Sequence, residues 1–212
     1  MLKKILVPVR GDAVVRSVLG HAAALARRHK AHLAVVHCRA QPEDLLPYST
    51  LLPAFARDTI MQQAHQLAEQ QEQQVRADLH GLAEELGLRE AGPAAGTATL
   101  EVIEQSEKMT DAIKHLGRLA DLIVVAKPDR DREIGVSTLK TALFQTGRPV
   151  LMCPREGDAP PDLGARLALG WNGSLESARA VALTLDLATA AEGVTILAGG
   201  KGEPHGATTD EL

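Results

Sequence analysis

The hydrophobic pattern at the start of the chain alternates between two kinds of segment. Residues 5–9 and 32–38 are short apolar runs without a helical period, and such runs predict buried strands. Between them, residues 12–30 repeat an apolar position every third or fourth residue, which predicts an amphipathic helix. A strand, a helix and a strand in this order indicate a parallel pair joined by a right-handed crossover.

The same alternation continues to residue 154. Residues 39–57 carry three prolines and predict an irregular connection. The pattern then predicts helices over residues 58–86, 107–119 and 137–146, and strands over residues 97–103, 121–126 and 149–154. Five strands alternating with four helices predict an α/β fold with an open, doubly wound, five-stranded parallel sheet.

Two details of this pattern bear on function. Ligands of doubly wound sheets bind beyond the carboxyl ends of the strands, so we expect a site after Val9 and Ala126, with Ser137 capping the helix that follows. Outside its apolar stripe, the helix over residues 58–86 consists mostly of glutamine and charged residues. We interpret this as a solvated surface, and a partner-binding face is the alternative.

The end of the chain repeats its beginning. Residues 155–164 have the composition of a linker and divide residues 1–154 from residues 165–212. An offset of 162 residues lays Lys4 on Arg166, and the same offset lays residues 33–36 on residues 195–198. We therefore predict that a strand, a helix and a strand form a partial second copy, which ends in a flexible polar tail.

Composition excludes several classes of function. The chain has 212 residues, a formal net charge of -4 and 2% aromatic residues. Binding to nucleic acid needs clustered Lys and Arg or aromatic stacking, so we expect no nucleic-acid partner. The run over residues 5–9 is shorter than the roughly 7 to 15 residues of a signal peptide core, and no run approaches the roughly 18 residues of a membrane span. We expect a cytoplasmic protein that does not bind membranes.

The sequence contains no recognisable catalytic or metal-binding motif. Cys38 and Cys153 are too few for a disulfide framework, and neither stands in a zinc-binding spacing. The chain carries no GxSxG, no HExxH and no complete Walker loop. We predict neither a metal site nor a catalytic residue.

These segments resemble the universal stress protein family in its tandem form. The resemblance covers residues 1–154 as one whole module and residues 165 to about 200 as the front of a second. It implies an adenine nucleotide alpha hydrolase-like fold with strand order 3-2-1-4-5, and modules that pair through an edge strand. The segments that carry it are Lys4-Ile5-Leu6-Val7-Pro8-Val9 with a turn at Gly11, Val35-Val36-His37, Ala120-Asp121-Leu122-Ile123-Val124-Val125 and Arg148-Pro149-Val150-Leu151-Met152.

The resemblance also implies where a nucleotide would bind, and this sequence departs from that pattern. ATP-binding members carry G-x2-G-x9-G-[S/T] after the fourth strand, where backbone amides approach the phosphates. Here Ala126, Asp129 and Val136 replace the three glycines, and the loop is three residues shorter. Arg10 replaces the aspartate that contacts the nucleotide in those members. The positions that the resemblance implies for a degenerate nucleotide site are Pro8, Val9, Arg10, Cys38, Ala126, Lys127, Asp129, Arg130, Ser137 and Thr138.

Two functions follow from this departure. The first is a non-enzymatic stress-response or regulatory module that does not hold ATP tightly and uses no cofactor. The second is an ATP-binding protein, either a nucleotide-dependent switch or a slow ATPase, in which Lys127, Arg130 and Arg132 clamp the phosphates of Mg-ATP. The carboxylate of Asp129 would repel a phosphate, which favours the first function.

The partial second copy predicts partners. It lacks the fifth strand through which modules pair, and about 45 residues are too few to bury both faces of such a unit. We expect it to dock on the first module or on another subunit. We also expect a homodimer through the edge strand from Val150 to Cys153, because pairing would satisfy its open backbone groups. The sequence predicts no particular partner protein.

Overall fold

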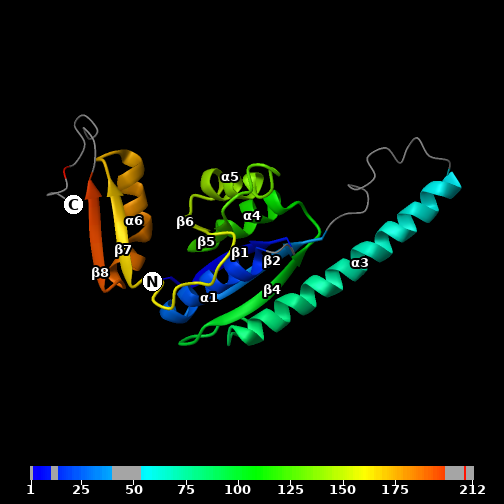
Figure 1. The fold of residues 1–212 in the computed structure, drawn as a ribbon, viewed down its shortest axis with the longest axis horizontal. Helices are drawn as coiled ribbons and strands as arrows, with labels where there is room; N and C mark the ends of the chain where they lie inside the picture. Colours follow the sequence, from blue (N-terminus) through cyan, green and yellow to red (C-terminus); the bar gives the residue numbers. More distant parts are fainter. Residues whose placement is uncertain (1, 11–13, 40–53, 199–207, 209–212) are drawn as a thin grey trace.

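The computed structural model describes residues 2–10, 14–39, 54–198 and 208 (Figure 1). The turn expected at Gly11 and the polar tail expected after residue 198 lie outside the described residues.

A parallel sheet forms the centre of residues 1–154. Its order is β3-β4-β2-β1-β5-β6, and every neighbouring pair is parallel. Five of these strands follow the predicted order 3-2-1-4-5, and the sixth, β3, is a two-residue strand that the sequence analysis did not predict. The strands are β1 (Lys4–Val9), β2 (His32–Cys38), β3 (Arg89–Glu90), β4 (Thr99–Gln105), β5 (Leu122–Ala126) and β6 (Val150–Cys153).

The helices lie on both faces of this sheet, as the doubly wound fold requires (Figure 1). The helix α3 begins at Ala54 rather than near residue 58, and α4 is shorter than predicted at both ends. Ser137 is not a helix cap, because the helix α5 is preceded by Gly135 in that position. The four helices are α1 (Val15–His29), α3 (Ala54–Glu85), α4 (Met109–Gly117) and α5 (Val136–Gln145).

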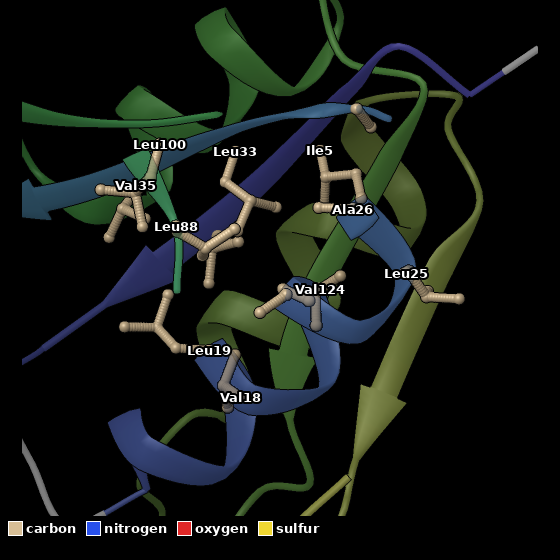
Figure 2. Close-up of a cluster of buried hydrophobic side chains, with 14 of the residues drawn as sticks. Ile5, Val18, Leu19, Leu25, Ala26, Leu33, Val35, Leu88, Leu100 and Val124 are labelled. Carbon is tan, nitrogen blue, oxygen red and sulfur yellow. The ribbon is translucent and has the colours of Figure 1, made fainter. Parts of the chain in front are cut away.

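Alternate residues of the central strands build two separate hydrophobic layers. Ile5, Val7 and Val9 of β1 lie in the layer that packs against α1 and the last turns of α3. Leu6 lies in the opposite layer, against α4 and α5. Figure 2 shows part of the first layer, where Leu19 of α1 meets the side chains of β2 and β5. Because β1 contributes to both layers, it is buried on both faces, as a central strand of a parallel sheet should be.

A carboxylate joins the starts of β1 and β5. Asp121 Oδ2 accepts hydrogen bonds from the backbone nitrogens of Lys3 at 2.8 Å and Lys4 at 2.9 Å. The Asp121 nitrogen donates in turn to the Lys4 carbonyl oxygen at 2.8 Å. These three bonds fix the register of two strands that are more than a hundred residues apart in the chain.

The end of the chain forms the predicted strand, helix and strand, with a parallel β7–β8 pair. The elements are β7 (Arg166–Trp171), α6 (Leu175–Thr189) and β8 (Gly193–Ala198). The side chain of Ser174 caps α6 by accepting a hydrogen bond from the Ser177 nitrogen at 3.2 Å.

The register of this second unit corrects the predicted alignment. β1 pairs Lys4 with His32, whereas β7 pairs Arg166 with Gly193, which is one residue less along the chain. The constant offset of 162 therefore fails at the second strand, and Val194 rather than Thr195 is the counterpart of Leu33. The reason is that the crossover through α6 is one residue shorter than the crossover through α1.

Contacts at the end of α1 and in the linker join the second unit to the first. Arg28 Nη2 donates to the Ala190 carbonyl oxygen at 2.9 Å and lies 3.7 Å from a carboxylate oxygen of Glu192. Leu163 and Leu187 pack against the first hydrophobic layer. None of the residues of α6 is buried.

Candidate functional site

The predicted positions after β1 and β5 meet at one cavity. Pro8, Val9 and Arg10 come from the end of β1, and Ala126 and Lys127 from the end of β5. Thr138, in the first turn of α5, completes this group. The meeting follows from the topology, because β1 and β5 are neighbouring parallel strands and their carboxyl ends share one edge of the sheet.

Side chains of the protein itself fill most of this edge. The Arg10 guanidinium donates to Thr138 Oγ1 at 3.0 Å, so it crosses from β1 to α5. Arg155, which follows β6, donates to the Lys127 carbonyl oxygen at 3.3 Å and lies 3.7 Å from Asp129 Oδ2. The cavity that remains has a volume of about 40 Å³. Pockets that hold a drug-sized ligand usually measure roughly 300 to 1,000 Å³, so this one has room for water rather than for a nucleoside triphosphate.

The loop from β5 to α5 is held by its own backbone. Asp129 and Ile134 exchange two backbone hydrogen bonds of 3.0 and 3.1 Å, and Asp129 Oδ1 accepts a third from the Arg132 nitrogen at 3.2 Å. Gly135 has a φ of 84°, in the left-handed region that L side chains rarely adopt. Glycine is therefore required at this turn for conformational reasons, without any phosphate. The loop closes on itself instead of presenting its amides in a row.

The remaining predicted positions do not line the cavity. Arg130 and Ser137 are exposed. Asp129 does not line the cavity itself, but its carboxylate lies 3.7 Å from Arg155, which does. Cys38 lies 3.9 Å from the sulfur of Met109, and it is Met109 that lines the cavity. The degenerate site thus divides into six residues that surround one cavity and four that lie beside it.

Sequence reasoning missed the residues that narrow the cavity. Met109 and Arg155 line it, together with apolar side chains of α1. Arg155 stands in a segment with linker composition, so no pattern marked it. Val15 and Val18 lie on the predicted apolar face of the helix, and Val18 is buried while Val15 packs against the first hydrophobic layer. Val14, which precedes α1, also lines the cavity. Only the three-dimensional arrangement shows that these side chains face this edge.

Both cysteines are unreactive by their surroundings. Burial raises the pKa of Cys38 to about 11, with Glu107 adding to the effect, and burial raises the pKa of Cys153 to about 12. Both thiols therefore stay protonated near neutral pH, and the thiolate that oxidation or metal binding requires is scarce. The part of the chain that the structure describes also has no cluster of three His, Cys, Asp or Glu suited to a metal ion.

The guanidinium of Arg10 and the hydroxyl of Thr138 in this cavity are already hydrogen-bonded to each other. Arg10 and Thr138 would have to separate before either could hold a phosphate. Among the described residues that line the cavity, none is a carboxylate or histidine that could act as a general base. The residues present thus do not fit Mg-ATP in this conformation.

Comparison with known protein families assigns the chain to one of them. A sequence profile of the Universal stress protein family matches residues 1–136, which is more than half of the chain. The chain therefore belongs to the universal stress protein family. No curated protein matches it in sequence. Among the described residues, no helix combines the length and the apolar character needed to cross a membrane.

The fold has a counterpart among solved structures. The universal stress protein UspA from Lactobacillus plantarum is 15% identical, with a TM-score of 0.50 over 72% of this chain and 97% of the other. At this identity the likeness concerns the fold alone. A universal stress protein in complex with cAMP is 16% identical, with a TM-score of 0.37 over 73% and 98% of the two chains. A universal stress protein from Archaeoglobus fulgidus in complex with dAMP is 14% identical, with a TM-score of 0.36 over 72% and 98%.

Proposed function

We propose that this universal stress protein is a non-enzymatic stress-response module that acts in the cytoplasm without binding ATP tightly. The observation that carries the proposal is the Arg10–Thr138 hydrogen bond across a cavity of about 40 Å³. A triphosphate would have to displace this bond and approach the Asp129 carboxylate. Both requirements cost free energy before any favourable contact forms.

Two measurements on the purified protein test this proposal. Denatured protein is examined for released nucleotide by chromatography, and native protein is titrated with Mg-ATP by calorimetry. We expect no released adenine nucleotide and a dissociation constant weaker than about 1 mM, which corresponds to about 4 kcal/mol of binding free energy. Stoichiometric nucleotide or a low-micromolar affinity would overturn it.

A matched pair of variants identifies the cause. Arg10→Gly removes the guanidinium that crosses the cavity, and we expect it to improve ATP binding. Arg132→Gly removes the same group from the exposed part of the loop, and we expect no improvement. If Arg10→Gly leaves ATP binding as weak as before, the Arg10–Thr138 bond is not what excludes the nucleotide.

A second function is favoured by the cationic groups at the same edge. Arg10, Lys127 and Arg155 all line the cavity, and a protein that uses them for phosphates would be an ATP-binding switch or a slow ATPase. In that case Arg155 would leave Asp129 on binding. Phosphate release measured with Mg-ATP distinguishes the two functions, because only the second predicts turnover that disappears in Arg10→Gly.

We further propose a domain organisation of one universal stress protein module over residues 1–154, a linker over residues 155–164 and a partial second module over residues 165–212. Its support is the repeated order of elements, since β7–α6–β8 forms a parallel pair with the same connectivity as β1–α1–β2. The docking of the second unit on the first rests on Arg28, Leu163 and Leu187.

For the assembly we propose a homodimer through β6. This strand ends the sheet, so one of its edges has no neighbour among the described residues. Met152 on β6 and Leu143 and Phe144 on the preceding helix are exposed, Phe144 to 80%, and pairing would cover such side chains. Light scattering at micromolar concentration is expected to give a dimer, and Met152→Lys a monomer. A wild-type monomer would overturn the proposal.

A further inference from the structure

A groove lies between the strand β4 and the helix α3. Figure 1 shows α3 alongside β4, and β4 lies on the side of the sheet away from β6. We call this groove the β4 groove. Its volume is about 1020 Å³, far larger than the cavity at the carboxyl ends of β1 and β5. Leu100, Val102 and Glu104 of β4 line one side, and Glu69, Arg76 and His80 of α3 line the other.

Among the described residues, no strand pairs with the outer side of β4 beyond Leu100, so the strand side of the β4 groove is a sheet edge. The Leu100 carbonyl oxygen accepts a hydrogen bond from the Ala91 nitrogen beyond β3, whereas the Gln105 carbonyl oxygen accepts one from the Arg39 nitrogen on the side of β2. Backbone groups alternate along a strand, so those of Val102 and Glu104 point to the same side as those of Leu100. β3 pairs with Thr99 and Leu100 of β4. A strand that continued β3 past Leu100 would lie in the groove.

Ion pairs hold α3 at a fixed distance from this edge. Arg39 lies 2.6 Å from Glu72 and 2.6 Å from Glu104, and Arg76 also pairs with Glu104. The contact with Glu72 Oε1 is ionic, without the alignment of a hydrogen bond. The hydrogen bonds from Arg39 and Arg76 hold the pKa of Glu104 at about 2, so the cluster stays charged over the physiological range. The groove is therefore preformed rather than opened by a ligand.

The charge left in the β4 groove after these pairs is negative. Five glutamates line it, against two arginines, and Glu72 and Glu104 are the partners of those arginines. Glu90 pairs with His80, and this hydrogen bond raises the pKa of His80. The side chain of Glu101 is 51% exposed and lies 3.5 Å from His32. Burial lowers the pKa of His32, so this histidine is mostly neutral near pH 7 and does not balance the negative charge of Glu101.

We propose that the β4 groove binds an extended, lysine- or arginine-rich segment of another protein, which adds to the sheet as a further strand beside β4. Such strand addition uses main-chain hydrogen bonds for affinity and side chains for selectivity. From Leu100 to Glu104 the edge is about 13 Å long at roughly 3.3 Å per residue, which accommodates four to five residues of the partner. Basic side chains on the α3 face of the added strand would reach Glu69, whereas Glu101 lies on the opposite face of β4.

The first experiment uses the wild-type chain and a labelled five-residue peptide of alternating lysine and valine. At low salt we expect binding on the order of 10⁻⁴ M, and no binding of the matched peptide of glutamate and valine. Amide hydrogen exchange gives the decisive pattern. The Val102 and Glu104 amides should slow roughly tenfold when the peptide saturates, while those of Glu101 and Ile103, already bonded to β2, should not change. Binding without this alternation, or equal binding of both peptides, would overturn the proposal.

Variants separate the backbone from the charge contribution. Val102→Pro removes one amide that faces the groove, and an edge strand tolerates proline at such a position. We expect it to abolish peptide binding, whereas Val102→Thr, which keeps the amide, should bind as the wild type does. Equal binding by a folded Val102→Pro and Val102→Thr would contradict strand addition.

The charge variants do not depend on the folding of the proline variant. Glu69→Lys should weaken binding of the lysine peptide at least roughly tenfold at low salt. Glu176→Lys on α6 makes a similar charge change away from the groove and should leave binding unchanged. Equal losses in both would mean that net charge, not the β4 groove, attracts the peptide.

Discussion

The units β1–α1–β2 and β7–α6–β8 share an order of elements and a parallel pairing, but they differ in burial. Leu19 on α1 is 0% exposed, whereas Leu183 on α6 is 50% exposed. Nine residues of α1 are buried and none of α6. In the first unit β1 has β2 on one side and β5 on the other, and α4 covers its second face.

This difference shows which properties are local. The alternation of apolar runs and amphipathic helix is enough to give a strand, a helix and a parallel strand in both places. Burial is not local, because it depends on strands and helices that come later in the chain. β7 and β8 have no further neighbours among the described residues, so the same local pattern leaves an open sheet there.

The largest expected effect comes from one substitution made in both units. Leu19→Ala should lower the free energy of unfolding by about 3 kcal/mol, because it leaves a cavity in the first hydrophobic layer. Leu183→Ala should lower it by less than about 1 kcal/mol, since half of the side chain is already in water. Urea unfolding followed by circular dichroism measures both. Similar losses would mean that the second unit is as well packed as the first.

A smaller effect is expected in the order of unfolding. Trp171 is the single tryptophan of the chain, is 7% exposed and lies on β7, so its fluorescence reports on the surroundings of β7 in the second unit. We expect its urea midpoint to lie about 1 M below the midpoint seen by circular dichroism, which is dominated by the larger first module. Coincident midpoints would show that the two units unfold as one.

The next prediction concerns pH and two histidines of the first unit. Burial lowers the pKa of His29, with Arg28 adding to the effect and the charge of Asp186 on α6 opposing it. Burial also lowers the pKa of His32, against the opposing charge of Glu101. A lowered pKa in the folded state means that the unfolded state binds protons more readily. The stability that these residues contribute is present above about pH 6.5 and is lost as the pH falls through their lowered pKa values.

Acid titration of the free energy of unfolding checks this expectation. Circular dichroism should show a loss of stability that begins below about pH 6.5. His32→Gln should reduce this loss, and Glu176→Gln, made on α6, should not. A Trp171 fluorescence transition that follows the same pH dependence would show that the second unit depends on the first for its stability.

The smallest expected effect belongs to the contact between the units. Arg28→Ala removes the bond to the Ala190 carbonyl oxygen and the ion pair with Glu192. Exposed pairs of this kind contribute about 0 to 1 kcal/mol, so the overall stability should change little. The two midpoints should nevertheless move further apart. The control is Arg166→Ala, which removes an ion pair with Asp162 without touching the first module.

Most of the fold could be predicted from sequence because its signals are local. The apolar runs and the amphipathic helices gave the five main strands and the four main helices within a few residues. β3 could not be predicted, since Arg89 and Glu90 are exposed and carry no apolar signal. The register of β8 could not be predicted either, because the length of a crossover is set by packing rather than by the repeat.

The site divides in the same way. The rule that ligands bind at the carboxyl ends of parallel strands was enough to bring Arg10, Lys127 and Thr138 to one cavity. The bond between Arg10 and Thr138 and the approach of Arg155 depend on tertiary structure. The β4 groove is even harder to predict from sequence, because it depends on the position of α3 beside β4 in the folded chain.

The hydrogen bonds that the Asp121 carboxylate accepts from Lys3 and Lys4 have a consequence for the synthesis of the chain. β1 leaves the ribosome before β5, yet its hydrogen bonds to β5 and to the Asp121 carboxylate wait until at least 117 further residues have been made. Pairing between segments so far apart is intrinsically slow, since the entropy of closing a long loop must be met before the contact forms. For several seconds, at roughly 5 to 20 residues per second, the nascent chain therefore exposes one edge of this central strand. Chaperone dependence should accordingly end when Asp121 emerges, well before the second unit is complete.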